Sequence, residues 1–214
     1  MAIIENFTST ANHHLNTVLQ GDCLTILPTL PARSVDFILT DPPYITRYQS
    51  RDGRIVPNDD NDRWLKPAFE QMYRVLANNA FAVSFYGWPQ ADKFLQAYRA
   101  AGFRVVGHFA FPKRYTSRSR FVRYQHECAH LLAKGNPPCP QDTIGDVIDW
   151  TYSGNKLHPT QKPLPVLLWE TAFGFAVYEP CQGSVLKRRP GPTQGGARER
   201  TFIGHGPLSG PQAA

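Results

Sequence analysis

The four residues Asp41-Pro42-Pro43-Tyr44 combine side-chain types that could hold a flat, amine-bearing ring. Each proline fixes its own backbone φ, removes an N–H donor and restricts the residue before it to extended geometry. Asp41 and the neighbouring carbonyl groups therefore offer only acceptors in fixed places, and Tyr44 adds a flat apolar face. This set matches an exocyclic amino group on a heterocycle such as adenine or cytosine.

This motif resembles the catalytic motif of DNA amino-methyltransferases, which methylate adenine N6 or cytosine N4 with S-adenosylmethionine. Acceptors that draw the amine hydrogens out of the ring plane orient the lone pair toward the methyl donor. An aromatic side chain replaces part of the stacking that a flipped base loses. The resemblance implies catalytic roles for Asp41, Pro42, Pro43 and Tyr44, favours adenine N6 and makes double-stranded DNA the partner. An ordinary turn after a strand is the alternative interpretation of this motif taken alone.

A second motif, His-Pro-Thr-Gln-Lys-Pro, lies at residues 158–163. With two prolines fixing the backbone, His158, Thr160 and Lys162 can offer donors and a charge to a carboxylate. The run is similar to the family segment that precedes the cofactor loop, and the resemblance implies contact with the methionine end of S-adenosylmethionine. It also implies that Asp22 contacts the adenine half, although Asp22 is equally suited to cap a helix. The resemblance covers residues 17–170.

The C-terminal region departs from the family pattern, which has Asp-Pro-Phe-x-Gly-Ser-Gly followed by a helix. The best match is residues 178–185, where Glu179 replaces Asp and Val185 replaces Gly; by resemblance Glu179, Gly183 and Ser184 line the cofactor. Prolines and glycines exclude a helix over 187–200. We therefore expect an irregular, altered cofactor-loop region and basic tail at 171–214. A non-catalytic DNA-binding remnant is the alternative function.

Apolar runs and helical periodicities alternate along the chain and predict the elements that position these motifs. We expect strands at 17–23, 35–39, 79–85, 103–111 and 124–133, and helices at 24–30, 64–76 and 89–101. The alternation favours a mainly parallel sheet. The resemblance specifies an α/β, Rossmann-like fold of the methyltransferase type with permuted motif order. Carboxyl ends of adjacent parallel strands share one crevice, so Asp22 and Asp41 are expected on the same side of the molecule.

We assign residues 1–170 to a catalytic domain that includes a short target-recognition segment near 113–155. Its basic stretch, residues 113–124, places five cations among aromatic and hydroxyl side chains: Lys113, Arg114, Arg118, Arg120 and Arg123. This composition predicts contacts with phosphates and exposed bases, with a solvated loop as the alternative. Residues 45–62 show no periodicity and suit either a mobile loop that closes over a substrate or an ordinary surface loop.

Residues 126–130, His-Glu-Cys-Ala-His, fit the zinc-peptidase pattern His-Glu-x-x-His. The stretch is also suited to a strand, which would separate His126 and His130 by about 13 Å, too far for one metal ion. We therefore expect no metal site. The stretch resembles a late strand of the methyltransferase fold.

Composition limits the class of protein. The chain has 214 residues and 42% hydrophobic content, enough for one substantial core, and a net charge of +6 that suits a polyanionic partner. Four scattered cysteines and the lack of an apolar leader or spanning stretch favour a reduced, cytoplasmic protein. The sequence does not specify an oligomeric state.

Overall fold

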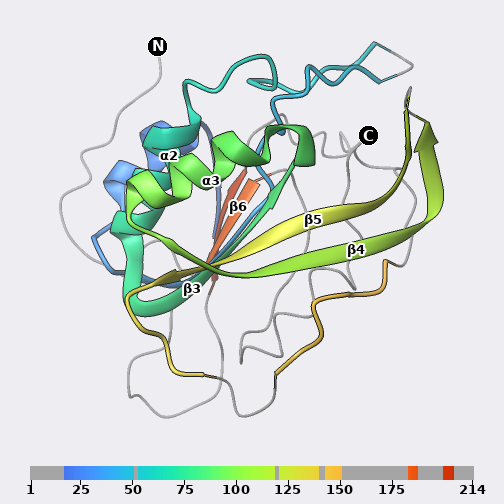
Figure 1. The fold of residues 1–214 in the computed structure, drawn as a ribbon. Coiled ribbons are helices and arrows are strands. Elements are labelled where there is room, and N and C mark those ends of the chain that lie inside the picture. Colours follow the sequence, from blue (N-terminus) through green and yellow to red (C-terminus); the bar gives the residue numbers. More distant parts are fainter. Residues whose placement is uncertain are drawn as a thin grey trace, which may run out of the picture.

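The computed structural model describes residues 17–50, 53–118, 121–139, 143–150, 183–187 and 200–204. Within them, one sheet runs in the order β1-β7-β6-β2-β3-β5-β4 (Figure 1). Its strands are β1 (Thr17–Gln20), β2 (Val35–Thr40), β3 (Leu76–Tyr86), β4 (Arg104–Arg118), β5 (Arg123–Lys134), β6 (Gly183–Lys187) and β7 (Arg200–Gly204). The helices are α1 (Cys23–Ile26), α2 (Leu65–Val75) and α3 (Ala91–Ala101), with the 3-10 turns η1 (Leu27–Thr29) and η2 (Trp88–Gln90).

The α/β fold class predicted from the sequence is confirmed, but the sheet is mixed and not mainly parallel. β1 with β7 and β2 with β3 pair in parallel, whereas β6 runs antiparallel to both β2 and β7. β5 runs antiparallel to β3 and β4. The sequence could not reveal this, because periodicity identifies a strand without fixing the direction of its neighbours.

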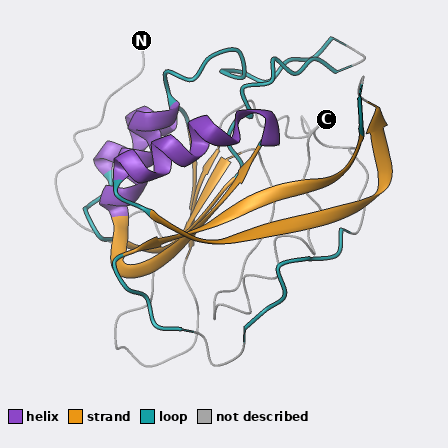
Figure 2. Ribbon diagram, in the orientation of Figure 1, coloured by secondary structure: helices purple, strands orange, loops and turns teal. Residues whose placement is uncertain are grey.

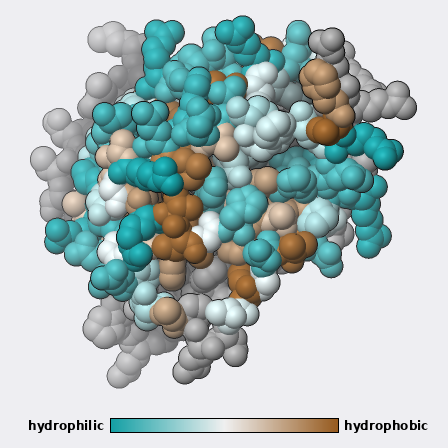
Figure 3. Space-filling model, viewed as in Figure 1, coloured by the Kyte–Doolittle hydropathy of each residue, from teal (hydrophilic) through white to brown (hydrophobic). Residues whose placement is uncertain are grey.

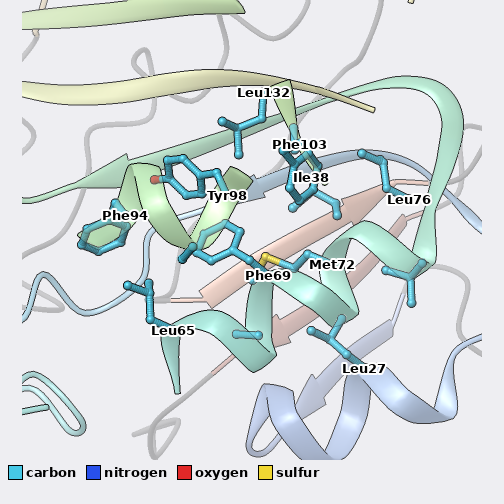
Figure 4. Close-up of a cluster of buried hydrophobic side chains, with 14 of the residues drawn as sticks. Leu27, Ile38, Leu65, Phe69, Met72, Leu76, Phe94, Tyr98, Phe103 and Leu132 are labelled. Atoms are coloured by element: carbon cyan, nitrogen blue, oxygen red, sulfur yellow. The ribbon is translucent and has the colours of Figure 1, made fainter. Parts of the chain in front are cut away.

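α2 and α3 cover one face of the sheet (Figure 2). Their apolar side chains recur at helical spacing, so each helix buries one stripe. Phe69 of α2 packs edge-on against Tyr98 of α3 at 4.7 Å between ring centroids. These rings meet strand residues such as Ile38 and Leu132 in what we call the helix-side core (Figure 4).

A second cluster occupies the opposite face of the sheet, and we call it the aromatic cluster. Its buried members are Phe37, Leu39, Val83, Phe85, Phe109, Phe111, Ala129 and Trp150. Successive residues of a strand point to opposite faces, so Ile38 lies in the helix-side core while Leu39 lies in the aromatic cluster. The central strands are therefore buried on both sides, as their continuous apolar runs indicate.

α2 passes directly into β3 without a loop, and Lys134 stabilises this junction. Its side chain is 7% exposed, and its ammonium donates to the carbonyls of Tyr73 and Leu76 at 2.6 Å each. The last carbonyls of a helix have no partner within the helix and carry its negative dipole end. The Lys134 ammonium donates to these carbonyls and its charge interacts favourably with the negative end of the helix dipole.

β4 and β5 form a long hairpin that extends beyond the helices (Figure 1). Residues 113–118 are therefore part of a strand and not of a loop, which was the alternative interpretation for residues 113–124. The outer edge of β4 is covered by residues 146–148, where Ala110 donates to the carbonyl of Asp146 and Ile148 donates back to Ala110. This contact protects an edge that would otherwise expose unpaired backbone groups.

The surface above α2 and α3 is mainly hydrophilic, with apolar atoms in small groups (Figure 3). Large apolar side chains that remain exposed include Trp88 and, at the end of the β4–β5 hairpin, Phe121 and Val122. In the part of the chain that the structure describes, no helix is long and apolar enough to cross a membrane.

We predict that Lys134→Met lowers the free energy of unfolding by about 2–3 kcal/mol, because two buried carbonyls lose their donor. Urea denaturation measures this change. Lys66→Met is the control, since the Lys66 side chain is 66% exposed and pairs with Glu70 on the surface. Equal stabilities of the two variants would contradict the role of Lys134 at the helix end.

Candidate functional site

The carboxyl ends of three strands line one edge of the sheet. In the register of the sheet, Gln20 of β1 pairs with Gly204, which pairs with Gly183. Thr40, the last residue of β2, pairs with Ser84 of β3 on one side and Ser184 of β6 on the other. Residues that follow Gln20 and Thr40 therefore lie along one edge, and these include Asp22 and Asp41.

The Asp41 to Tyr44 turn begins directly after β2 and is closed by its own side chains. The Tyr44 phenol donates a hydrogen bond to Oδ1 of Asp41 at 3.0 Å. Burial raises the pKa of Tyr44 well above its usual value, and the negative charges of Asp41 and Glu127 raise it further. The phenol therefore stays protonated and remains a donor, and the carboxylate of Asp41 is held in a fixed orientation.

The ring of Tyr44 packs against the aromatic cluster below the turn. Phe85 and Phe111 in that cluster lie 5.2 Å apart, and Trp150 contacts Phe111 edge-on at 6.4 Å. Trp150 is 6% exposed and its indole N–H is buried without a hydrogen-bond partner. Trp150 belongs to the segment predicted to recognise the target, and the structure shows that it is also part of the core.

Lys113 and Glu127 form a buried ion pair between neighbouring strands. The Lys113 ammonium lies 2.8 Å from a Glu127 carboxylate oxygen, and the two side chains are only 6% and 23% exposed. Lys113 was predicted from the sequence to bind DNA phosphates, and the structure directs its charge to a carboxylate near Tyr44. Sequence reasoning missed Glu127 here, because its partner Lys113 lies on another strand and only the pairing of β4 with β5 brings the two side chains together.

Of the other predicted DNA-binding residues, Arg114, Arg118 and Arg123 lie on the strands of the same hairpin. Arg114 and Arg123 are exposed. The backbone of Arg118 pairs with that of Arg123, which brings their positions opposite each other. Arg120 lies outside the described residues.

The predicted cofactor residues are only partly described. Asp22 caps α1, since its Oδ1 accepts from the Leu24 amide at 2.8 Å, so the alternative capping role is present. Gly183 and Ser184 begin β6 beside the end of β2, within a strand and not within a turn. His158, Thr160, Lys162 and Glu179 lie outside the described residues.

Asp59 ties the first residues of the loop after the Asp41 to Tyr44 turn to the later part of that loop. Asp59 is 2% exposed, and its carboxylate accepts from the Thr46 hydroxyl at 3.1 Å and the Tyr48 amide at 2.6 Å. The Arg47 amide donates to the carbonyl of Asp59 at 3.0 Å. Among the two predicted alternatives, these bonds favour an anchored surface loop over a mobile one.

His126 and His130 lie on the strand β5, and the structure gives them no shared helix face. His130 is 6% exposed and stacks on Tyr86 at 4.1 Å. Burial, with the nearby His108, lowers the pKa of His130 to about 4, so the imidazole is neutral at pH 7. No group of three or more His, Cys, Asp or Glu side chains that could hold a metal ion occurs among the residues described. His130 is a core residue.

The fold is that of the α/β methyltransferases, and the Asp41 to Tyr44 turn lies directly after the central strand β2. The family model described as DNA methylase matches residues 35–162, and the chain belongs to this family of N6-adenine and N4-cytosine DNA methylases. The chain is 51% identical over 174 residues to the "Putative methylase YubD" of Escherichia coli (strain K12), covering 79% of this chain and 77% of that protein.

Solved structures share the fold. The protein TTHA0409 of Thermus thermophilus, named a putative DNA modification methylase, has a TM-score of 0.54 at 16% identity, covering 74% of each chain. The complex of M1.HpyAVI with SAM has a TM-score of 0.51 at 17% identity, covering 76% of each chain. At these identities the likeness supports the fold alone.

We predict that Asp59→Ala loosens residues 46–50, because two hydrogen bonds to a buried carboxylate are lost. Hydrogen exchange of these amides should rise by about tenfold or more. Asp60→Ala is the matched control, since Asp60 is exposed and its carboxylate accepts a hydrogen bond from the side chain of neighbouring Asn61. Unchanged protection in Asp59→Ala would contradict the anchoring role.

Proposed function

We propose that this protein transfers a methyl group from S-adenosylmethionine to the exocyclic amine of a flipped base in double-stranded DNA, with adenine N6 as the target. The observation that supports this most directly is the turn after β2, where Tyr44 donates to Asp41 and orients its carboxylate. Family membership supplies the reaction class. Because DNA is the substrate, we expect the reaction in the cytoplasm.

The Asp41 to Tyr44 turn can bind and orient the target amine for methyl transfer. The Asp41 carboxylate and the carbonyl of Pro42 accept the two amine hydrogens, which turns the nitrogen lone pair out of the ring plane. Pro43 keeps this backbone rigid. Tyr44 stacks on the flipped base, and since its phenol stays protonated, the ring adds no second negative charge.

The edge of the sheet fits a cofactor beside this turn. S-adenosylmethionine supplies an electrophilic methyl group when bound. We propose that the exposed Asp22, which follows β1 at the same edge, contacts its adenosine half. Gly183 and Ser184 lie beside the end of β2 and would line the same place. We assign the methionine end to His158, Thr160 and Lys162, with Glu179 as a further contact, on the resemblance of their motifs.

DNA would approach along the β4–β5 hairpin. Arg114 and Arg123 are exposed there, and Arg118 and Arg120 belong to the same basic stretch. Exposed cations on a projecting element suit phosphate contacts. Lys113 differs, because its ammonium is paired with Glu127 inside the protein.

A DNA-binding remnant without transfer activity is the second candidate. It is favoured by one observation: Gly183 and Ser184 begin a strand that runs antiparallel to β2, where the family pattern has a turn after a strand. Such a chain would keep the acceptor turn and the basic hairpin but would not bind S-adenosylmethionine. Cofactor binding therefore separates the two candidates.

The test is tritium transfer from S-adenosyl-[methyl-³H]methionine to genomic DNA from a methylation-deficient host, followed by nucleoside analysis. We predict labelled N6-methyladenine, and a loss of about 100-fold or more in Asp41→Ala, because one oriented acceptor is removed. Isothermal titration should show equal cofactor affinity in both proteins. A folded wild-type chain that gives neither cofactor binding nor transfer would establish the remnant, and labelled N4-methylcytosine would correct the base.

We predict that Arg123→Ala weakens DNA binding and lowers the slope of log K against log salt by about one, because one phosphate contact is lost. Lys113→Met should leave that slope unchanged, since its charge already pairs with Glu127. Fluorescence anisotropy with a labelled duplex at several salt concentrations measures both. A drop in slope for Lys113→Met but not for Arg123→Ala would reverse the assignment.

A further inference from the structure

The backbone of Gly87 lies unusually close to Tyr44. A Cβ atom built on Gly87 would be 2.9 Å from the Tyr44 Cβ, 3.2 Å from its carbonyl oxygen and 3.3 Å from its Cγ. These atoms belong to the backbone and the root of the side chain, so rotation of the ring cannot relieve the contact. Any side chain at residue 87 must displace Tyr44 or be displaced by it.

Space is the reason for a glycine here, and not backbone conformation. Gly87 has φ −85° and ψ 119°, an extended geometry that any residue adopts. A glycine in such a position marks a close approach by another part of the chain. The part that approaches is the turn that carries the acceptor and the stacking ring.

Gly87 is held in place by the buried end of β3 and by η2. It follows β3, whose last five residues, 82–86, are all buried, and it caps η2, where Gln90 donates to its carbonyl at 3.0 Å. η2 leads into α3, which is anchored by the fully buried Phe94 and Tyr98. An added methyl group at residue 87 would therefore move the turn and leave β3 in place.

Ile45 fixes the turn from the other side. Its φ is 59°, a left-handed value that is strained for a β-branched residue. Its side chain is 8% exposed in the helix-side core, while Tyr44 packs against the aromatic cluster on the opposite face. Two successive residues therefore fix the chain on opposite faces of the sheet, Tyr44 on one and Ile45 on the other. Tyr44 is held between Ile45 and Gly87.

We propose that Gly87 is a positioning residue of the base pocket, which sets the place of the Tyr44 ring and, through the 3.0 Å hydrogen bond, the orientation of Asp41. The contact itself is inferred from the geometry of residues 44, 45 and 87. Its effect on catalysis rests on the proposed methyl transfer. Gly87 needs no contact of its own with base or cofactor. It acts through Tyr44.

The experiment compares Gly87→Ala with Gln96→Ala, a control at an exposed position on α3, a helix that carries none of the proposed catalytic, cofactor or DNA-binding residues. In the tritium assay, kcat of Gly87→Ala should fall about 10- to 100-fold, since small misplacements of a positioning group have effects of that size. The affinity for S-adenosylmethionine should not change. Gln96→Ala should match the wild type in both measurements.

A double-mutant cycle with Tyr44→Ala shows whether Gly87 acts through the ring. In the Tyr44→Ala background, Gly87→Ala should lower kcat by less than about twofold more. Full additivity would overturn the proposal, as would wild-type activity in Gly87→Ala. A fall in cofactor affinity or a general loss of stability in this variant would assign Gly87 a structural role instead.

A measurement that needs no activity keeps the inference separate from the proposed function. In protein labelled with 3-fluorotyrosine, the ¹⁹F resonance of Tyr44 is identified by its loss in Tyr44→Phe. It should shift in Gly87→Ala and stay in place in Gln96→Ala. If the wild type transfers no methyl group but the resonance shifts, the proposed function fails and the positioning contact stands. An unmoved resonance overturns the contact.

Discussion

The parallel pairing of β2 with β3 is the constraint on which the site depends. Thr40, the last residue of β2, pairs with Ser84, two residues before the end of β3, so the two strands end close to each other at one edge of the sheet. The residues that follow are then forced together: Tyr44 from one strand meets Gly87 from the other. The two prolines after Asp41 make the first of these segments stiff, and the entry of β3 into η2 makes the second stiff. A rigid turn after β2 results from the pairing of two ordinary strands.

The two faces of the sheet have different roles. The helix-side core holds the strands in register. On this side of the sheet His130 is neutral at pH 7, and the ammonium of Lys134 donates to two backbone carbonyls. The aromatic cluster on the other face supports Tyr44 and carries the Lys113–Glu127 pair near it. Because the side chains of a strand alternate between faces, one strand such as β5 serves both purposes.

Local signals in the sequence predicted much of this arrangement. The apolar run of β2, the spacing of α2 and α3, and Gly102, which ends α3 in a left-handed conformation, all lie where the sequence indicated. Pairing between distant segments was not predictable. The pairing of Lys113 with Glu127, the anchoring of the loop by Asp59 and the burial of Trp150 each require a partner far along the chain. Composition alone made each of these residues resemble a surface group.

Local sequence patterns also could not predict the direction of each strand. This matters most for β6, which lies beside the candidate site. Gly183 and Ser184 were matched to a cofactor turn by residue type, yet they begin β6, which runs antiparallel to β2. An antiparallel neighbour brings its start, and not its end, to the carboxyl end of β2. Gly183 still reaches the edge that Asp22 and Asp41 share, because Gln20, Gly204 and Gly183 form one row of the sheet. The direction of β6 therefore changes how the chain arrives at this row, while Gly183 stays in it.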